Sequence, residues 1–239
     1  QFTLSLTAAN AVDRVEFLKD NILEKMIVHS GTWERQPLPG RFAFKFEVEF
    51  GWGPETRLFP DAALKVWEGS LQVPGHLMGV EKLWNSFGQQ ILEWRDDRCD
   101  FRLTTHRGTE TGKWMGPSQV RRESLVFEVE GGIDDVLTLT VDGEQYALPV
   151  RMLLQGTRIY AQYSQCERRI IKKFGPTPHY RDDFIWHCAF KFRVRRAVPS
   201  PAYTLNESFT TTLDAGSQYR LRVWLKNGDA AWTSPIFCR

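Results

Sequence analysis

The polarity of this chain alternates residue by residue over long stretches, which is typical of β-strands with one buried face. In Arg220–Lys226 every second residue is Leu or Val, and in Arg41–Phe50 Phe and Val alternate with Ala, Lys and Glu. Both stretches predict strands with one apolar face and one face toward water. Asn227-Gly228 favours a tight hairpin turn, so Ala230–Phe237 is expected to return as a strand. Pro235 has no N–H, which predicts that the return strand is an edge or is interrupted there.

Shorter alternating stretches predict further strands along the chain. Gly131-Gly132 and Asp142-Gly143 separate short apolar runs, and Asp-Gly between two such runs is a strong hairpin signal. Val12–Val28 fits either two strands around an Asp20-Asn21 turn or a helical stripe, and we favour the hairpin. Val80–Ile91 carries apolar residues at helical spacing and predicts a short helix.

Regular short strands with turn residues between them predict an all-β fold, because parallel α/β units need long helices between their strands. We expect an antiparallel β-sandwich, made of two packed subdomains, with at most one or two short helices. Turn-forming residues are densest between residues 155 and 178. The expected domains are therefore a β-sandwich at residues 1–155, a connector at 156–178, and a smaller β-subdomain at 179–239 that ends in the hairpin.

Composition limits the classes of partner. A formal net charge of +2 over 239 residues gives no support for charge-driven binding to nucleic acid or membrane, and no apolar run is long enough to span a membrane. The chain begins at Gln1 without Met or an apolar leader, which suggests a processed protein or an excised piece. The four cysteines are far apart in sequence, so three disulfide pairings remain open, as do free thiols: Cys99, Cys166, Cys188 and Cys238.

Several segments together resemble the β-rich C-terminal region of large exported bacterial proteins: Val12–Asn21, Phe46–Pro54, Trp67–Leu71, Arg196–Pro199 and Asn227–Phe237. In those proteins an upstream domain is similar to the polymerase-and-histidinol-phosphatase (PHP) class of metal-dependent hydrolases. The resemblance implies a secreted or extracellular all-β accessory region that docks on a hydrolase domain of the same parent protein. It transfers no catalytic residue, and the chain departs from it at Phe237-Cys238, where an aromatic-Val pair is usual.

The chain lacks the local motifs of common catalytic sites. It contains no His-x-His pair, no Gly-x-Ser-x-Gly turn and no Gly-rich phosphate loop. Adjacent carboxylates such as Asp96-Asp97 point to opposite faces of a strand and are more typical of turns. We therefore expect no catalytic residue, no metal site and no cofactor, although a polysaccharide-acting enzyme with scattered site residues stays an alternative.

Nine tryptophans and two basic strand faces indicate a binding surface. Flat rings stack on sugars, and arginines bind anionic groups. If Lys191/Arg193/Arg195 and Arg220/Arg222/Lys226 lay on paired strands, they would form one basic strip, but we favour pairing of each with acidic neighbours. Trp186 and Trp232 are assigned to the core. The candidate ligand-binding residues are Trp52, Trp84, Trp114, Arg193, Arg220, Arg222 and Trp224.

The sequence thus predicts a non-catalytic accessory module that docks on a hydrolase domain, binds carbohydrate or a cell-surface polymer, or does both. The main alternative is an extracellular subunit that associates with copies of itself through exposed strand edges. The near-neutral charge balance argues against nucleic acid as a partner.

Overall fold

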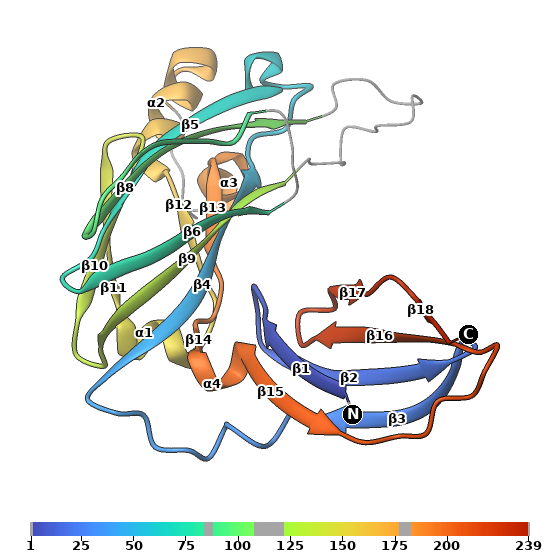
Figure 1. The fold of residues 1–239 in the computed structure, drawn as a ribbon. Helices are drawn as coiled ribbons and strands as arrows, with labels where there is room; N and C mark the ends of the chain where they lie inside the picture. The colour runs from blue at the N-terminus through green and yellow to red at the C-terminus, as the bar shows by residue number, and fades with distance from the viewer. Residues whose placement is uncertain (1, 84–87, 108–121, 177–182, 239) are drawn as a thin grey trace. The chain divides into compact units, whose positions relative to one another are not determined.

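The computed structural model describes residues 2–83, 88–107, 122–176 and 183–238, which form antiparallel sheets packed together, with four short α-helices (Figure 1). The all-β sandwich prediction is confirmed, with more helices than the one or two expected. The chain divides into two compact units. The terminal unit combines Gln1–Lys45 with Val198–Arg239, and the central unit is Phe46–Ala197. This division differs from the predicted domains at 1–155 and 179–239.

The terminal unit is a small sandwich in which both ends of the chain take part. One sheet has two strands in the order β1-β15, and the other has the order β17-β16-β2-β3, with β18 also paired to β16. The short helix α4 (Ser200–Tyr203) leads from β14 (Val198–Pro199) into β15. The sheet strands are β1 (Phe2–Thr7), β2 (Val12–Lys19), β3 (Ile22–Val28), β15 (Thr204–Phe209), β16 (Gln218–Leu225), β17 (Ala230–Trp232) and β18 (Ile236–Phe237).

The two hairpins of the terminal unit bear out the turn predictions. Asp20 and Asn21 have φ angles of 50° and 69°, so β2 and β3 form the favoured hairpin rather than a helix. At the end of the chain, Gly228 takes a φ of 95° and the return strand is interrupted around Pro235. The alternation in β16 is also confirmed, since Val223 lies in the core between the two sheets.

The core of the terminal unit lies between its two sheets. Val15 and Val223 pack against Leu205, and Phe17 packs against Phe209 with ring centroids 5.1 Å apart. Because side chains alternate along a strand, the residues between these core positions on β2 and β16 point to the other face of the sheet. That outer face carries the first candidate site.

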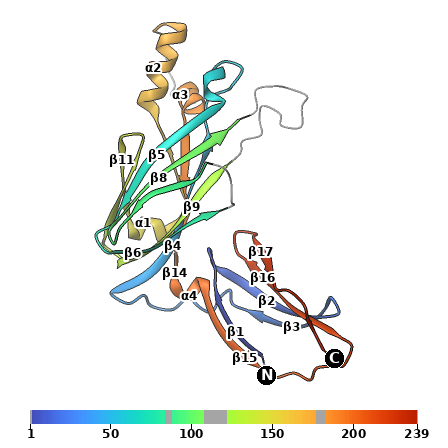
Figure 2. The same cartoon turned by 45° about the horizontal axis from the view of Figure 1, so that its top comes forward.

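The central unit is a larger sandwich of two sheets (Figures 1 and 2). One sheet has the strand order β11-β10-β5-β8-β7 and the other β12-β13-β4-β9-β6. The strands are β4 (Arg41–Trp52, which begins in the terminal unit), β5 (Leu64–Gln72), β6 (His76–Leu83), β7 (Gln90–Trp94), β8 (Arg98–His106), β9 (Glu123–Gly132), β10 (Val136–Val141), β11 (Glu144–Pro149), β12 (Arg158–Ala161) and β13 (Lys191–Val194). A 3-10 turn (Pro60–Ala62) and the helices α1 (Val150–Gln155), α2 (Tyr163–Phe174) and α3 (Asp183–Cys188) complete it.

Aromatic rings fill the core of the central unit. Phe50 of β4 contacts Trp67 of the facing sheet at a centroid distance of 5.2 Å and Phe192 of the neighbouring strand at 5.6 Å. Phe101 and Phe127 continue the same layer. These side chains are fully buried, which fixes the opposite face of β4 as the outer face of its sheet.

Two local predictions for the central unit are wrong. The predicted helix Val80–Ile91 begins with the end of β6, which pairs with β9, and closes with the start of β7, which pairs with β8; its residues 84–87 lie outside the described residues. A short apolar run does not distinguish helix from strand by its spacing alone, and partner strands decide here. The predicted connector 156–178 contains β12 and all of α2, whose apolar side chain Ile170 is buried. Among the described residues, no helix is long and apolar enough to cross a membrane.

The polar face predicted for Arg41–Phe50 does not point into water. Lys45, Glu47 and Glu49 are all buried, and Glu49 is only 2% exposed. A buried carboxylate requires partners of opposite charge or hydrogen-bond donors. The partners of Glu49 define the second candidate site.

Candidate functional site

The outer face of the large sheet of the terminal unit gathers charged and aromatic side chains. Arg222 of β16 lies directly opposite Glu16 of β2 on one side and opposite Trp232 of β17 on the other. Trp224 lies opposite Arg14 in the same way. Side chains directly opposite each other in antiparallel strands share a face, so these residues form one surface. We name it the Glu16 cluster: Arg14, Glu16, Arg222, Trp224 and Trp232.

Glu16 is the acceptor at the centre of this cluster. It is 5% exposed, and it accepts hydrogen bonds from Arg14 Nε at 2.8 Å and from Arg222 Nε at 2.5 Å. Burial raises the pKa of Glu16, but the hydrogen bonds from the two arginines outweigh it, and the pKa lies below its ordinary value. Arg14 also pairs with Asp13 at 2.6 Å. Two arginines and two carboxylates thus balance one another.

Two tryptophans complete the Glu16 cluster. The guanidinium carbons of Arg14 and Arg222 lie 5.1 and 5.3 Å from the centroid of the Trp224 ring, within cation–π range. The Trp232 ring meets Trp224 edge-on at 6.5 Å and is 57% exposed. Trp232 is therefore available to a ligand, and its predicted place in the core is wrong.

The turn explains why Trp232 lies on the outer face. A two-residue turn at Asn227-Gly228 would have paired Trp232 with Val223, whose side chain points into the core. Instead Trp224 pairs with Ala230, and Leu225 N donates to Asp229 O at 2.9 Å across a longer turn. A register shift of one residue moves every side chain of the strand to the other face.

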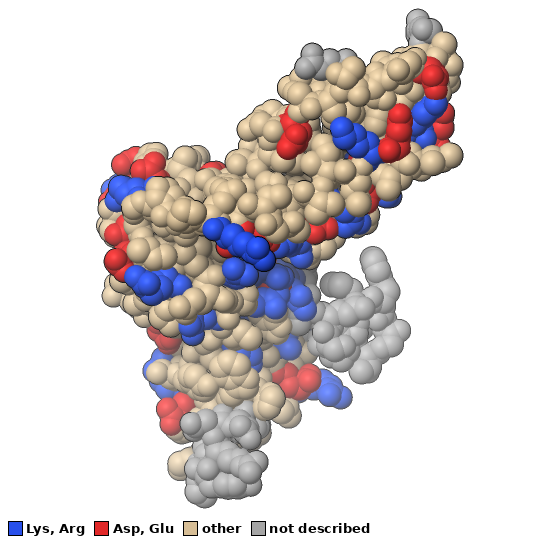
Figure 3. Space-filling view, turned by 90° about the horizontal axis from the view of Figure 1, so that it is seen from below, with Lys and Arg blue, Asp and Glu red and all other residues tan. Residues whose placement is uncertain are grey.

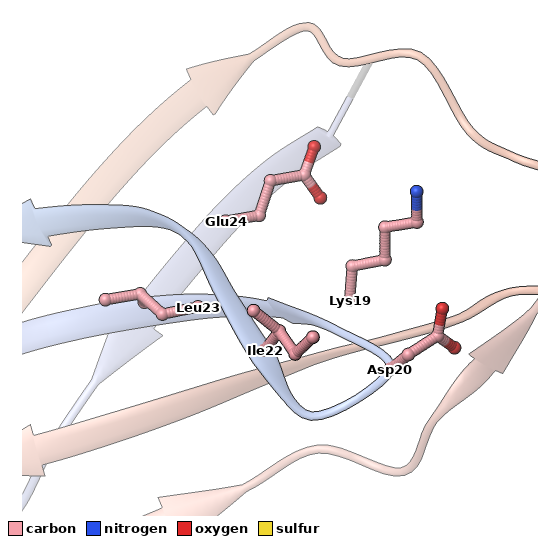
Figure 4. Close-up of a pocket in the computed structure, with 5 residues that line it drawn as sticks. All are labelled: Lys19, Asp20, Ile22, Leu23 and Glu24. Carbon is pink, nitrogen blue, oxygen red and sulfur yellow. The ribbon is translucent and has the colours of Figure 1, made fainter.

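The free edge of this sheet is apolar and exposed. In β3, large apolar side chains remain open to solvent, with Ile22 at 74%: Ile22, Leu23, Met26 and Val28. A depression of about 470 Å³ lies at the β2–β3 turn and is lined by Lys19, Asp20, Ile22, Leu23 and Glu24. Lys19 and Glu24 point to the same side of the hairpin (Figure 4). Lys19 pairs with Asp214, and Glu24 accepts from Thr211, so the charged groups are already partnered within the unit.

In the central unit, three arginines converge on one carboxylate. Arg193 of β13 lies opposite Glu49 of β4 and donates to Glu49 Oε2 through Nε at 3.1 Å. Arg195 Nη2 lies 2.8 Å from the same oxygen, and Arg122 Nη1 lies 3.3 Å from Oε1. Arg195 also reaches Glu47 at 3.1 Å. We name this group the Glu49 cluster: Glu49, Trp52, Arg122, Arg193 and Arg195.

Trp52 is the aromatic member of the Glu49 cluster. The guanidinium carbons of Arg193 and Arg122 lie 5.0 and 5.1 Å from its ring centroid. A register irregularity beside Trp52, together with a φ of 140° at Gly51, brings this ring to the side of the sheet where Glu49 lies. In the space-filling view, basic side chains gather on the central unit with few acidic ones between them (Figure 3).

The structure places the predicted ligand-binding residues in separate groups. Trp52 and Arg193 meet in the Glu49 cluster, and Arg222 and Trp224 meet in the Glu16 cluster. Arg220 lies on the same outer face and bonds to Asn21. Trp84 and Trp114 lie outside the described residues.

The basic residues do not form one strip, the alternative we did not favour, because β13 and β16 belong to different sheets. The favoured pairing of the basic residues with acidic neighbours across the strands is confirmed for Arg193 with Glu49 and Arg222 with Glu16. Trp186 is half-buried rather than in the core, and it stacks on the Lys191 ammonium at 5.1 Å.

Six members of the two clusters were not among the predicted ligand-binding residues: Arg14, Glu16, Glu49, Arg122, Arg195 and Trp232. A signal existed for Glu16 and Glu49, since each sits at an alternate position of a strand whose other positions are apolar. No local signal shows that arginines more than a hundred residues away cover these carboxylates.

No cysteine is a member of either cluster. All four cysteines are free, and three are buried. Burial raises the pKa of Cys99 to about 12 and that of Cys166 to about 11, so both stay protonated at neutral pH. Within the described part of the chain, no group of three or more His, Cys, Asp or Glu side chains is arranged to hold a metal ion.

Comparison with known proteins adds no relative: no family model, no curated protein and no solved structure matches this chain.

Proposed function

We propose that this chain is a non-catalytic accessory module that binds carbohydrate through the Glu16 cluster. In this proposal it is secreted, docks on a hydrolase domain of the same parent protein, and holds that domain near a glycan or cell-surface polymer. The observation that carries the proposal is the exposed Trp232 ring beside Trp224 on a sheet face that the terminal unit leaves uncovered.

The chemistry of the Glu16 cluster suits an uncharged sugar. An exposed indole offers a flat apolar face for the C–H side of a pyranose ring, at a small cost in side-chain entropy. Arg14 and Arg222 can donate to hydroxyl groups, whereas Glu16 and Asp13 balance their charge. Because the arginines are held by Glu16 and by the Trp224 ring, little ordering is needed when a ligand binds.

A glycan array probed with the wild-type chain and with Trp232→Ala tests the proposal. We expect the wild type to bind a set of neutral glycans, and Trp232→Ala to weaken that binding by at least about tenfold. Trp94→Ala is the matched control, because Trp94 is 50% exposed but lies in the central unit. Equal binding by the two variants, or no glycan bound by the wild type, would contradict the proposal.

A second candidate function, self-association, is favoured by the exposed edge strand β3. An unpaired strand edge with exposed apolar side chains is a template for pairing with another chain. In this case the double variant Ile22→Lys/Met26→Lys should sediment as a monomer at concentrations at which the wild type associates. A wild type that stays monomeric up to high concentration would rule this candidate out.

A further inference from the structure

We infer that the Glu49 cluster is an anion-binding site, separate from the proposed sugar face, and that it takes carboxylate groups of an acidic polysaccharide. The inference concerns the central unit alone and does not depend on what the Glu16 cluster binds. It starts from an imbalance of charge within the cluster. Three guanidinium groups meet Glu49 and Glu47, so the named side chains carry one positive charge in excess.

Arg122 is the member with the most unused hydrogen-bonding capacity. A guanidinium has five N–H donors. Among the described residues, Arg122 donates one hydrogen bond, to Glu49 Oε1, and its side chain is 54% exposed. Its remaining donors are therefore open to a ligand from solvent.

The Arg122 guanidinium is also held in place before any ligand arrives. It lies 5.1 Å from the Trp52 ring centroid, and Glu49 fixes one of its ends. Glu49 itself is covered by the arginines, so an incoming anion meets N–H groups before it meets the carboxylate. A planar, preorganised fork of donors matches the geometry of a carboxylate.

The surroundings favour a sugar polymer over nucleic acid. Ile159 of β12 lies directly opposite Arg193 and is exposed, which offers an apolar surface beside the cationic group. An acidic sugar presents a carboxylate next to an apolar ring face, which matches a guanidinium beside an apolar side chain. Nucleic-acid binding relies on many phosphate contacts along a basic stripe, whereas this cluster is compact and the chain carries a net charge of only +2.

Isothermal titration of the full chain with polygalacturonate at low salt tests the inference. Arg122→Ala is the test variant. Removal of this side chain breaks only one long contact to Glu49, so the fold should be retained. Arg102→Ala is the matched control: Arg102 is comparably exposed, pairs with Glu68, and lies on the other sheet of the same unit. Pullulan is the neutral polysaccharide, and a single-stranded oligonucleotide is the alternative polyanion.

We expect the wild type to bind polygalacturonate and not pullulan at this site, with binding that weakens as salt rises. Arg122→Ala should bind polygalacturonate about tenfold more weakly, and Arg102→Ala within about twofold of the wild type. Trp232→Ala should leave polygalacturonate binding unchanged, which separates this inference from the proposed sugar face.

Three results would overturn the inference. The first is a wild type that does not bind polygalacturonate. The second is an equal loss in Arg122→Ala and Arg102→Ala. The third is tighter binding of the oligonucleotide than of polygalacturonate at the same salt, which would assign the cluster to nucleic acid.

Discussion

The terminal and central units each bury a glutamate among arginines, but the two clusters differ in net charge. Each has a glutamate buried on the outer face of a sheet, with two or more arginines bonded to it and a tryptophan ring beneath a guanidinium. In the terminal unit, Arg14 and Arg222 are matched by Glu16 and Asp13. In the central unit, Glu49 alone receives contacts from all three arginines of its cluster.

This difference in charge is the basis of the two binding proposals. In the Glu16 cluster the charges cancel and an indole ring remains exposed, so apolar stacking is the main interaction left for a ligand. In the Glu49 cluster, guanidiniums cover the ring and positive charge remains, so an anion is favoured. We therefore propose different ligand chemistry for two surfaces built from similar residue types.

The largest expected effect comes from removing the glutamate of the central unit. Glu49→Ala leaves three guanidiniums close together, and loss of one partner from a buried ion pair costs about 3 to 5 kcal/mol of unfolding free energy. Native-state hydrogen exchange of β4 and β13 amides measures this change within the unit. Glu49→Gln, which keeps the shape but not the charge, should also destabilise β4 and β13. A loss of unfolding free energy no larger than that caused by Glu16→Ala would contradict the proposed difference between the two units.

Glu16→Ala should cost less, about 1 to 3 kcal/mol, because Arg14 keeps its pairing with Asp13. The exchange of amides in β2 and β16 reports this loss. Protection in β4 and β13 serves as the internal control and should not change. A loss of protection spread over both units would show that the Glu16 cluster does not act locally.

Acid should weaken the terminal unit through the same carboxylate. The folded-state pKa of Glu16 is lowered, so its contribution to stability is present above the unfolded value near 4.5 and is lost as pH falls through the lower folded value. Unfolding free energy followed from pH 6 to pH 3 should therefore fall more steeply in the wild type than in Glu16→Gln. Identical slopes would contradict this origin of the acid sensitivity.

The smallest expected effect is that of Trp232→Ala on stability. Because the ring is largely exposed, its removal should change the unfolding free energy by less than about 0.5 kcal/mol. Urea denaturation measures this change in unfolding free energy. A much larger loss would mean that the ring supports the fold, which would remove the reason to regard it as a ligand contact.

The local turns could be read from the sequence because they depend on neighbouring residues. Asp20-Asn21 and Asp142-Gly143 take the positive φ angles that such dipeptides tolerate. The alternation of β16 was likewise predicted correctly. The face of Trp232 was not, because one additional turn residue changes the register of β17, and sequence alone does not fix that number.

The rest of the fold could not be predicted from the sequence, because it depends on pairing between residues far apart in the chain. Phe2 pairs with Phe209, so the two ends of the chain build one unit, although no stretch of sequence marks this. Glu49 is covered by Arg193 of β13 and by Arg195, which follows that strand, and alternation within Arg41–Phe50 does not reveal this. The kinds of residue in the candidate clusters could therefore be predicted. Which individual residues come together depends on the order of the strands in the sheets.

Hydroxyl-radical footprinting of tryptophan side chains, with and without a saturating neutral glycan from the array, tests the central claim most directly. We expect the glycan to protect Trp232 from oxidation and to leave the oxidation of the comparably exposed Trp94 unchanged. Unchanged oxidation of Trp232 in the presence of a bound glycan would contradict it.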